Sequence, residues 1–320
     1  MFLATPSGAS GGKRCLGCQS ITRRGSVDTA NFYTNGTSET FLGEFIQGHR
    51  ESVVLATKYS LAAPGNDPNA AGNHRKSMMQ AVEASLKRLQ TDYIDLYWVH
   101  MWDGITPVEE VMRGLDDMVR QGKVLYLGIS DAPAWWIAQA NTLAELRGWT
   151  QFTGLQIEYS LLERTVELEL IPMSKALNLG VLAWSPLAKG VLSGKYHGEG
   201  RAEGGRMTKE GTKDFFPEEQ RAAPIISAVK SVSKQTGRSM AQVALAWLRH
   251  RTVPVIPIIG ARKLSQLQDN LASLDLELSA EQLKSLDGAS QSELGFPQSV
   301  YQKEMVRGVR YGGVRDRLLL

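Results

Sequence analysis

The sequence predicts an α/β protein of the TIM (β/α)8 barrel class. From residue 27 onward, short apolar or β-branched runs alternate with longer segments at helical spacing, a pattern typical of repeated βα units around a parallel sheet. No Gly-x-Gly-x-x-Gly turn follows any of these runs, which argues against an open, doubly wound dinucleotide-binding sheet. A chain of 320 residues is also an ordinary length for one barrel.

Seven runs have strand character, because β-branched and aromatic residues dominate them and turn residues bound them. In chain order they are 26–31, 52–59, 93–100, 124–130, 152–160, 180–186 and 253–261. An eight-stranded barrel therefore lacks one obvious strand.

Amphipathic segments between the runs predict the helices. Residues 37–48 and 78–89 repeat apolar side chains at three- and four-residue spacing, and 107–122 opens with Pro107 and two acids and closes with Gly122. Two later helices, 239–248 and 279–286, each begin with a Ser-x-x-Gln pattern, which predicts a capping box.

The sequence divides into three parts. We expect residues 1–26 to form an irregular segment in place of the first βα unit, residues 27–290 to form the barrel, and residues 291–320 to form a polar and basic tail. Within the barrel, the Gly-rich and charged stretch 197–224 predicts a loop near the cofactor or substrate, either a lid or a plain insertion.

The first strand and first helix are predicted to be missing or degenerate. The only strand-like stretch before residue 26 is "MFLAT", and "KRCLGCQSITRR" is a poor helix. Without a first strand, strands two and eight would leave an open gap with unpaired hydrogen-bonding groups. One hypothesis is that residues 1–26 reflect an alternative start and a shifted reading frame, so that the natural protein is longer.

Composition excludes several function classes. The formal charge is only +3 and no basic stripe carries interleaved aromatics, so we expect no nucleic-acid partner. No apolar run has the length of a membrane span, and we expect a cytoplasmic protein without membrane contact. The two cysteines, Cys15 and Cys18, and the scattered histidines lack matching ligands, so we expect no metal.

Three consecutive predicted strands deliver four titratable residues: Asp28 on the first, with Tyr33 in the loop that follows it, Lys58 at the end of the second and His100 at the end of the third. In a barrel these strand ends meet at the mouth where chemistry takes place. A tyrosine hydroxyl, with an ordinary pKa near 10, gives up its proton more readily beside a cation such as a lysine, and a carboxylate keeps that lysine charged. A histidine adds a hydrogen-bond donor. This set would protonate a carbonyl oxygen while a nicotinamide delivers hydride to the carbon.

Each of the four has an ordinary alternative. A strand-end lysine can be a solvated charge, a histidine after an apolar run can be a satisfied core residue, and a loop tyrosine can be a surface aromatic. Their joint placement favours the chemical interpretation.

Seven ordered blocks resemble the aldo-keto reductases, in the branch that includes aryl-alcohol dehydrogenases and potassium-channel β-subunits. The blocks span about residues 27–290: "DTANFYTNGTSE", "VLATK", "YIDLYWVHMWD", "GISD", "LQIEYSLLER", "WSPLAKGVLSGKY" and "IIGARKLSQLQDNL". The resemblance implies an NADPH-dependent (NADP+ in reverse) carbonyl reductase whose catalytic tetrad falls on the same Asp28, Tyr33, Lys58 and His100.

The resemblance also implies cofactor contacts. Ser130, Asp131 and Gln156 would hold the nicotinamide carboxamide and Trp184 would stack on the ring. Asp131 departs from the family, which usually has Asn there, and a carboxylate cannot donate to the carboxamide oxygen. The remaining expected contacts, to the pyrophosphate and the adenosine end, are Ser185, Leu187, Lys189, Gly190, Gly260, Arg262, Gln266 and Asn270.

The sequence thus predicts reversible reduction of an aldehyde or ketone with a proton from Tyr33. Nearby Phe32, Trp98, Met101 and Trp102 suggest an apolar or aromatic aldehyde as substrate, although core packing explains Trp98 equally well. Two alternatives stay open: an NADPH-binding sensor or regulatory barrel with little turnover, and an inactive truncated barrel. The sequence leaves monomer and oligomer equally open.

Overall fold

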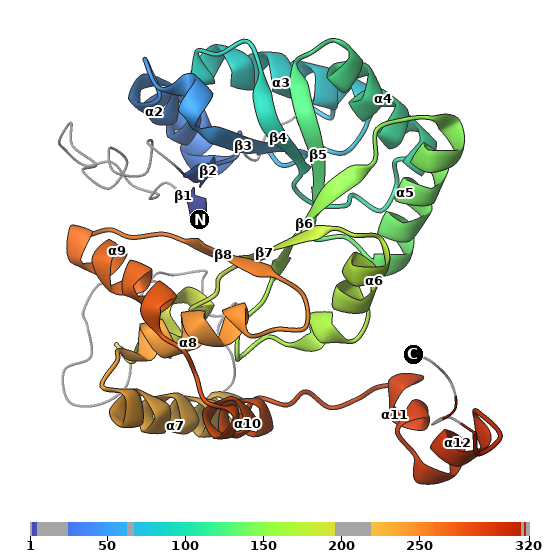
Figure 1. Ribbon diagram of the computed structural model, residues 1–320. Helices are drawn as coiled ribbons and strands as arrows, with labels where there is room; N and C mark the ends of the chain where they lie inside the picture. The colour runs from blue at the N-terminus through green and yellow to red at the C-terminus, as the bar shows by residue number, and fades with distance from the viewer. Residues whose placement is uncertain (1, 5–24, 63–66, 196–218, 315–316, 318–320) are drawn as a thin grey trace.

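The computed structural model is a closed barrel of eight parallel strands surrounded by helices (Figure 1). It describes residues 2–4, 25–62, 67–195, 219–314 and 317. The strands follow chain order around the barrel: β1 (Phe2–Ala4), β2 (Ser26–Asp28), β3 (Val54–Tyr59), β4 (Ile94–Val99), β5 (Val124–Ser130), β6 (Phe152–Glu158), β7 (Gly180–Trp184) and β8 (Val255–Ile259). The seven predicted strands are all present, and an eighth precedes them.

The eighth strand is the short β1, which closes the barrel. Leu3 is in register with Val27 of β2 on one side and with Ile259 of β8 on the other. The gap that the sequence predicted between the second and eighth strands is therefore closed, and the closing strand comes from "MFLAT". Phe2–Ala4 belong to the barrel and not to an irregular segment before it. The first helix would fall in residues 5–24, outside the described part of the chain.

Helices cover the outside of the strands. They are α2 (Thr37–Phe45), α3 (Arg75–Leu89), α4 (Val108–Arg120), α5 (Ala134–Arg147), α6 (Leu170–Ala176), α7 (Glu219–Thr236), α8 (Met240–Arg249), α9 (Leu264–Leu271) and α10 (Ala280–Ala289). Residues 219–224 of the predicted loop form the start of α7, and 197–218 lie outside the described residues. None of the helices in the described ranges combines the length and apolar composition needed to cross a bilayer.

The two predicted capping boxes differ. At α10 the Ser279 hydroxyl accepts from the backbone of Gln282, and the Gln282 side chain accepts from the backbone of Ser279. At α8 the Ser239 hydroxyl caps the helix, but the Gln242 side chain donates to Asp269 at 2.7 Å instead. The capping box predicted for 239–248 is therefore wrong for Gln242, because the carboxylate of Asp269 on α9 lies within hydrogen-bonding distance of its amide.

The predicted tail carries two short helices, α11 (Gln298–Tyr301) and α12 (Glu304–Val309), which lie apart from the barrel beyond an extended segment (Figure 1). The Gln298 side chain donates to the carbonyl of Leu168 at 3.3 Å. This places α11 near the loop before α6.

The barrel interior is filled by an indole. Trp98 of β4 is fully buried and packs with Ala56 of β3, Leu182 of β7 and Ile258 of β8. Its ring occupies the space beside Gly128 of β5, where an added Cβ would overlap the indole, and beside Gly154 of β6. Trp98 is therefore a core residue and does not contact a substrate, as the alternative of core packing predicted.

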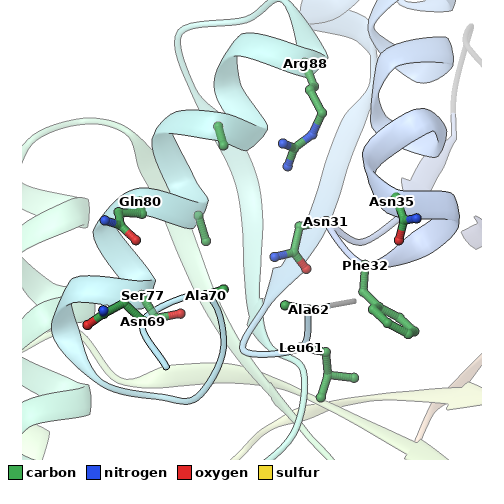
Figure 2. Close-up of a pocket in the computed structure, with 12 residues that line it drawn as sticks. Asn31, Phe32, Asn35, Leu61, Ala62, Asn69, Ala70, Ser77, Gln80 and Arg88 are labelled. Carbon is green, nitrogen blue, oxygen red and sulfur yellow. The ribbon is translucent and has the colours of Figure 1, made fainter. Parts of the chain in front are cut away.

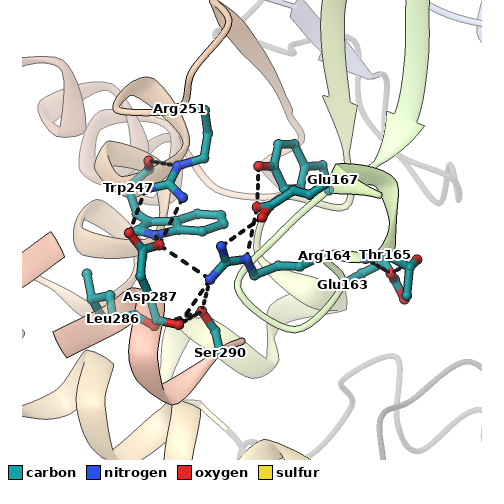
Figure 3. A network of polar contacts seen from close by, with 10 residues as sticks. Glu163, Arg164, Thr165, Glu167, Trp247, Arg251, Leu286, Asp287 and Ser290 are labelled. Atoms are coloured by element: carbon teal, nitrogen blue, oxygen red, sulfur yellow. Dashed lines mark hydrogen bonds and ion pairs between the residues drawn. The ribbon is translucent and has the colours of Figure 1, made fainter. Parts of the chain in front are cut away.

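A polar network ties α8 and α10 to the loop after β6 (Figure 3). Arg164 binds Glu167 through two hydrogen bonds and reaches the Asp287 carbonyl at 3.1 Å. The Asp287 carboxylate accepts from the Trp247 indole and from Arg251, each at 2.9 Å. Because Arg251 also lies 4.0 Å from the Trp247 ring centroid, these contacts fix both helices against the barrel.

Candidate active site

A buried ion pair joins the ends of β2 and β3. Asp28 ends β2, and Lys58 is the fifth residue of β3, so both side chains reach the same end of the barrel. The Lys58 ammonium donates to Asp28 and to the carbonyl oxygen of Thr29 at 2.9 Å. The side chains are 1% and 0% exposed, so neither charge is screened by water.

The partners of Lys58 keep it charged despite its burial. Burial alone would lower the pKa of the Lys58 ammonium, but the Asp28 carboxylate and the Tyr33 hydroxyl outweigh it, and the pKa is raised. The other Asp28 oxygen accepts from the Gln156 amide of β6 at 3.1 Å. Lysine and aspartate are thereby fixed in position as well as in charge.

Tyr33 stands on a tight turn directly after β2. Asn35 and Gly36 have φ values of 52° and 86°, left-handed conformations that asparagine and glycine accept most readily, whereas the β-branched Thr34, with φ 48°, adopts one at a cost. Gly36 then precedes α2. The Tyr33 hydroxyl accepts from the Lys58 ammonium at 3.3 Å, and Tyr33 itself is half-buried. The predicted proton donor therefore contacts the cation that the sequence assigns to it.

His100 completes the group from the end of β4. Its ring lies edge-on to that of Tyr33, with centroids 5.7 Å apart and planes at 82°. Burial, with a smaller contribution from the Lys58 ammonium, lowers the pKa of His100 to about 3, so the imidazole is neutral at physiological pH.

The tautomer of His100 follows from its surroundings. Nδ1 is buried and has no hydrogen-bond partner among the described residues. A buried unpaired N–H is rarer than a buried unpaired acceptor, so we assign the proton to Nε2. His100 is thus a neutral donor, and the structure brings all four predicted catalytic residues together.

The residues predicted to hold the carboxamide lie at the ends of β5, β6 and β7. Ser130 ends β5 in register with Gln156, and its buried hydroxyl lies beside the Asp131 carboxylate. The Gln156 amide already donates to Asp28. The Asp131 carboxylate accepts from the Trp184 indole at 3.0 Å. The Ser130 hydroxyl, the Gln156 amide and the Asp131 carboxylate therefore already interact with protein groups at the end of the barrel where a polar ligand would bind.

The loop after β7 has an unusual backbone. Ser185, Ala188 and Lys189 have φ values of 53°, 46° and 56°, and Gly190 has 98°. Such turns can direct amide groups toward an anion. The Gly190 amide, however, donates to the Leu187 carbonyl at 2.8 Å, so this predicted pyrophosphate contact is occupied within the loop.

A third predicted group follows β8 at the start of α9. Gly260 and Arg262 are exposed, and the Gln266 side-chain oxygen accepts from the backbone amides of Arg262 and Lys263 at 3.0 and 3.3 Å. Asn270, one turn further along α9, is buried. The exposed Arg262 and Lys263 at a helix N-terminus suit a phosphate.

Sequence reasoning missed two polar partners. Glu158 forms an ion pair with Lys189 at 3.0 Å, and the Thr29 carbonyl binds Lys58. Glu158 could have been found, because it lies two residues after Gln156 and shares its face of β6. The carbonyl contact of Thr29 has no signal in the sequence, since any residue carries that group.

A separate cavity of about 310 Å³ lies behind the turn that carries Tyr33 (Figure 2). One wall is the face of α3 with Ser77, Gln80 and Arg88, and the other is the segment with Asn31 and Asn35. None of the four predicted catalytic residues lines it. Phe32, the neighbour of Tyr33 in sequence, does line this cavity.

Comparisons with known proteins agree with this geometry. The sequence profile described as the aldo/keto reductase family matches residues 21–291. The chain is 40% identical over 278 residues to a norsolorinic acid reductase of Emericella nidulans, covering 85% of this chain and 70% of the relative. It is 38% identical over 285 residues to an aryl-alcohol dehydrogenase [NADP(+)] of Phanerodontia chrysosporium, covering 85% and 74%. It is 35% identical over 286 residues to a putative aryl-alcohol dehydrogenase of Saccharomyces cerevisiae, covering 86% and 75%.

Proposed function

The chain belongs to the aldo/keto reductase family and is a nicotinamide-dependent oxidoreductase of carbonyl compounds, and we propose that Tyr33 is its proton donor and NADPH its preferred reductant. The observation that supports this most directly is the contact of the Tyr33 hydroxyl with the buried Lys58–Asp28 pair, beside a neutral histidine. The reverse reaction would oxidise an alcohol with NADP+.

Each residue of the tetrad has one role in this proposal. When bound, a nicotinamide cofactor would supply the hydride for the carbonyl carbon. Tyr33 gives its hydroxyl proton to the carbonyl oxygen, and the Lys58 ammonium stabilises the phenolate that remains. Asp28 and the Thr29 carbonyl keep Lys58 charged and oriented. The His100 Nε2–H donates a hydrogen bond to the same carbonyl oxygen and aligns it.

The cofactor contacts are proposals of the same kind. The Ser130 hydroxyl would bind the carboxamide, with Gln156 beside it, and Trp184 would support the ring. The loop with Ser185, Leu187, Lys189 and Gly190 would face the pyrophosphate, and Gly260, Arg262, Gln266 and Asn270 the adenosine end. Arg262 is exposed and can bind a 2′-phosphate through its forked guanidinium, which is the basis for preferring NADPH over NADH.

The substrate proposal is an aromatic or apolar aldehyde or ketone. Met101, the neighbour in sequence of His100, is 43% exposed, whereas Phe32, the neighbour of Tyr33, is 39% exposed and lines the separate cavity of Figure 2. Trp102 packs edge-on against Trp135 of α5, with ring centroids 5.8 Å apart, and Trp135 is 59% exposed. Exposed aromatic side chains near a polar centre suit a planar apolar ligand. Two relatives carry names that refer to aryl alcohols.

A binding and turnover assay tests the proposal. We expect wild-type protein to oxidise NADPH in the presence of nitrobenzaldehyde. Arg262→Ala should weaken NADPH binding by about 10- to 100-fold, the cost of a lost charge-assisted contact, and leave NADH binding unchanged. Arg147→Ala, which removes an exposed arginine of α5, is the matched control. NADPH binding without reduction of any aldehyde would support the sensor alternative instead.

A further inference from the structure

Two charged groups contact the Trp184 indole from different sides. Its indole N–H donates to the Asp131 carboxylate at 3.0 Å, and the Lys189 ammonium lies 5.7 Å from the ring centroid. Lys189 is itself paired with Glu158 at 3.0 Å. The indole, from the last residue of β7, is thus oriented by groups that follow β5 and β7.

Asp131 adopts a backbone conformation that aims it at the indole. Its φ is 44°, a left-handed value that costs a non-glycine residue energy and is found most often for Asn and Asp. Its backbone carbonyl also accepts from the amide of Trp102 at 3.4 Å. With one side-chain oxygen committed to the indole, the carboxylate acts as an acceptor toward protein, and it has no proton to offer a carboxamide oxygen.

We propose that Asp131 is a positioning residue: its carboxylate fixes the Trp184 indole as the support for the nicotinamide ring, and its protonation loosens that support. The proposal rests on the proposed function, because it takes Trp184 as the ring support. It changes the predicted role of Asp131, from a cofactor contact to a residue that acts through Trp184.

The surroundings of Asp131 make a proton switch reachable. Burial raises the pKa of the Asp131 carboxyl to about 6, the Trp184 hydrogen bond opposes this, and Glu158 on β6 adds to the increase. The facing cations are Lys58 on β3, which opposes the increase, and Lys189 after β7. Asp131 is therefore ionised at pH 7.5 and largely protonated at pH 5, where the bond to the indole loses its charge assistance and becomes a weaker, neutral hydrogen bond.

The first measurement needs no cofactor. In ¹⁵N-labelled protein without ligand, the indole N–H resonance of Trp184, assigned with Trp184→Phe, should shift between pH 5 and 8 with a midpoint near 6. The shift should be absent in Asp131→Asn, whose amide oxygen still accepts but does not titrate. Trp247 is the internal control: it donates to Asp287, whose pKa is lowered because Arg251 outweighs burial, so its resonance should not move.

The second measurement is cofactor affinity. Asp131→Leu should raise the Kd for NADP+ at pH 7.5 by about tenfold, and Asp131→Asn should stay within about threefold of wild type, because only the leucine removes the acceptor. Equal affinity of wild type and Asp131→Leu, or a Trp184 resonance that does not respond to pH, would overturn the inference. If wild type binds no NADP(H) at all, the proposed function fails with it. If wild type binds and turns over but the variants behave alike, only the inference fails.

Discussion

Removing Asp28 should destabilise the protein far more than an ordinary polar substitution. Asp28→Asn removes the negative charge, so the fully buried Lys58 ammonium keeps only neutral partners: the new amide oxygen, the Thr29 carbonyl at 2.9 Å and the Tyr33 hydroxyl at 3.3 Å. Breaking a buried ion pair at one end costs about 3–5 kcal/mol, because the remaining charge is neither solvated nor paired. Against typical unfolding free energies of about 5–15 kcal/mol, that loss is large.

The assay is chemical denaturation at pH 7.5, where Lys58 is not titrating. The pKa of Lys58 is raised in the folded protein, so its contribution to stability is complete below the ordinary value of 10.5 and is lost only as pH rises above it. The double variant Asp28→Asn with Lys58→Met removes both charges and should recover at least half of the loss. It should still lack activity, because Tyr33 has lost its cation.

Two results would refute this reasoning. The first is a loss below about 1 kcal/mol in Asp28→Asn, which is the behaviour of a solvent-exposed pair. The second is a double variant as unstable as the sum of the two single variants, since that would mean that the charges do not interact.

The other predictions concern acid stability, core packing and the α10 network. The pKa of His100 is about 3, below its ordinary 6.5, so the folded protein loses stability as pH falls between these two values. His100→Gln should therefore reduce the pH dependence of the unfolding free energy between pH 6.5 and 4. An unchanged pH dependence would contradict the lowered pKa of His100. Gly128→Ala places a Cβ against the Trp98 ring and should lower the free energy of unfolding by about 1–3 kcal/mol or more. Gly180→Ala, whose Cβ would make only an ordinary contact at 3.7 Å, should lower it by less than about 1 kcal/mol. Equal losses of stability in thermal unfolding would argue against the packing of Trp98. Asp287→Ala removes the side-chain acceptor of Arg251 and of the Trp247 indole and one ion-pair contact of Arg164, so amide hydrogen exchange should rise in α10 and not in α4. Protection equal to wild type would rule out the anchoring role.

Much of the barrel could be predicted because its signals are local. Strand-like runs and helix caps are written in neighbouring residues, and the four tetrad residues stand at strand ends, where parallel strands must converge. β1 could not be predicted firmly, since three residues carry too little pattern and depend on pairing with β2 and β8.

The detailed contacts of the candidate site could not be predicted from the sequence, because they depend on strand register and on backbone conformation. The Gln156 amide binds Asp28, a partner 128 positions away that only barrel closure brings near. The left-handed residues Ser185, Ala188 and Lys189 are not glycines, so their types give no warning of the turn. The contact of Asp131 with Trp184 likewise joins the ends of two strands that are not neighbours in the sheet.

The central claim is that Tyr33 donates the proton, and one comparison tests it most directly: kcat and the Kd for NADPH in wild type and Tyr33→Phe. Phenylalanine keeps the ring beside His100 and removes only the hydroxyl that contacts Lys58. We predict that kcat for an aromatic aldehyde falls by about 10²- to 10⁴-fold, the usual contribution of a general acid, while the Kd changes by less than about twofold. A Tyr33→Phe enzyme that keeps the wild-type kcat would contradict the assignment.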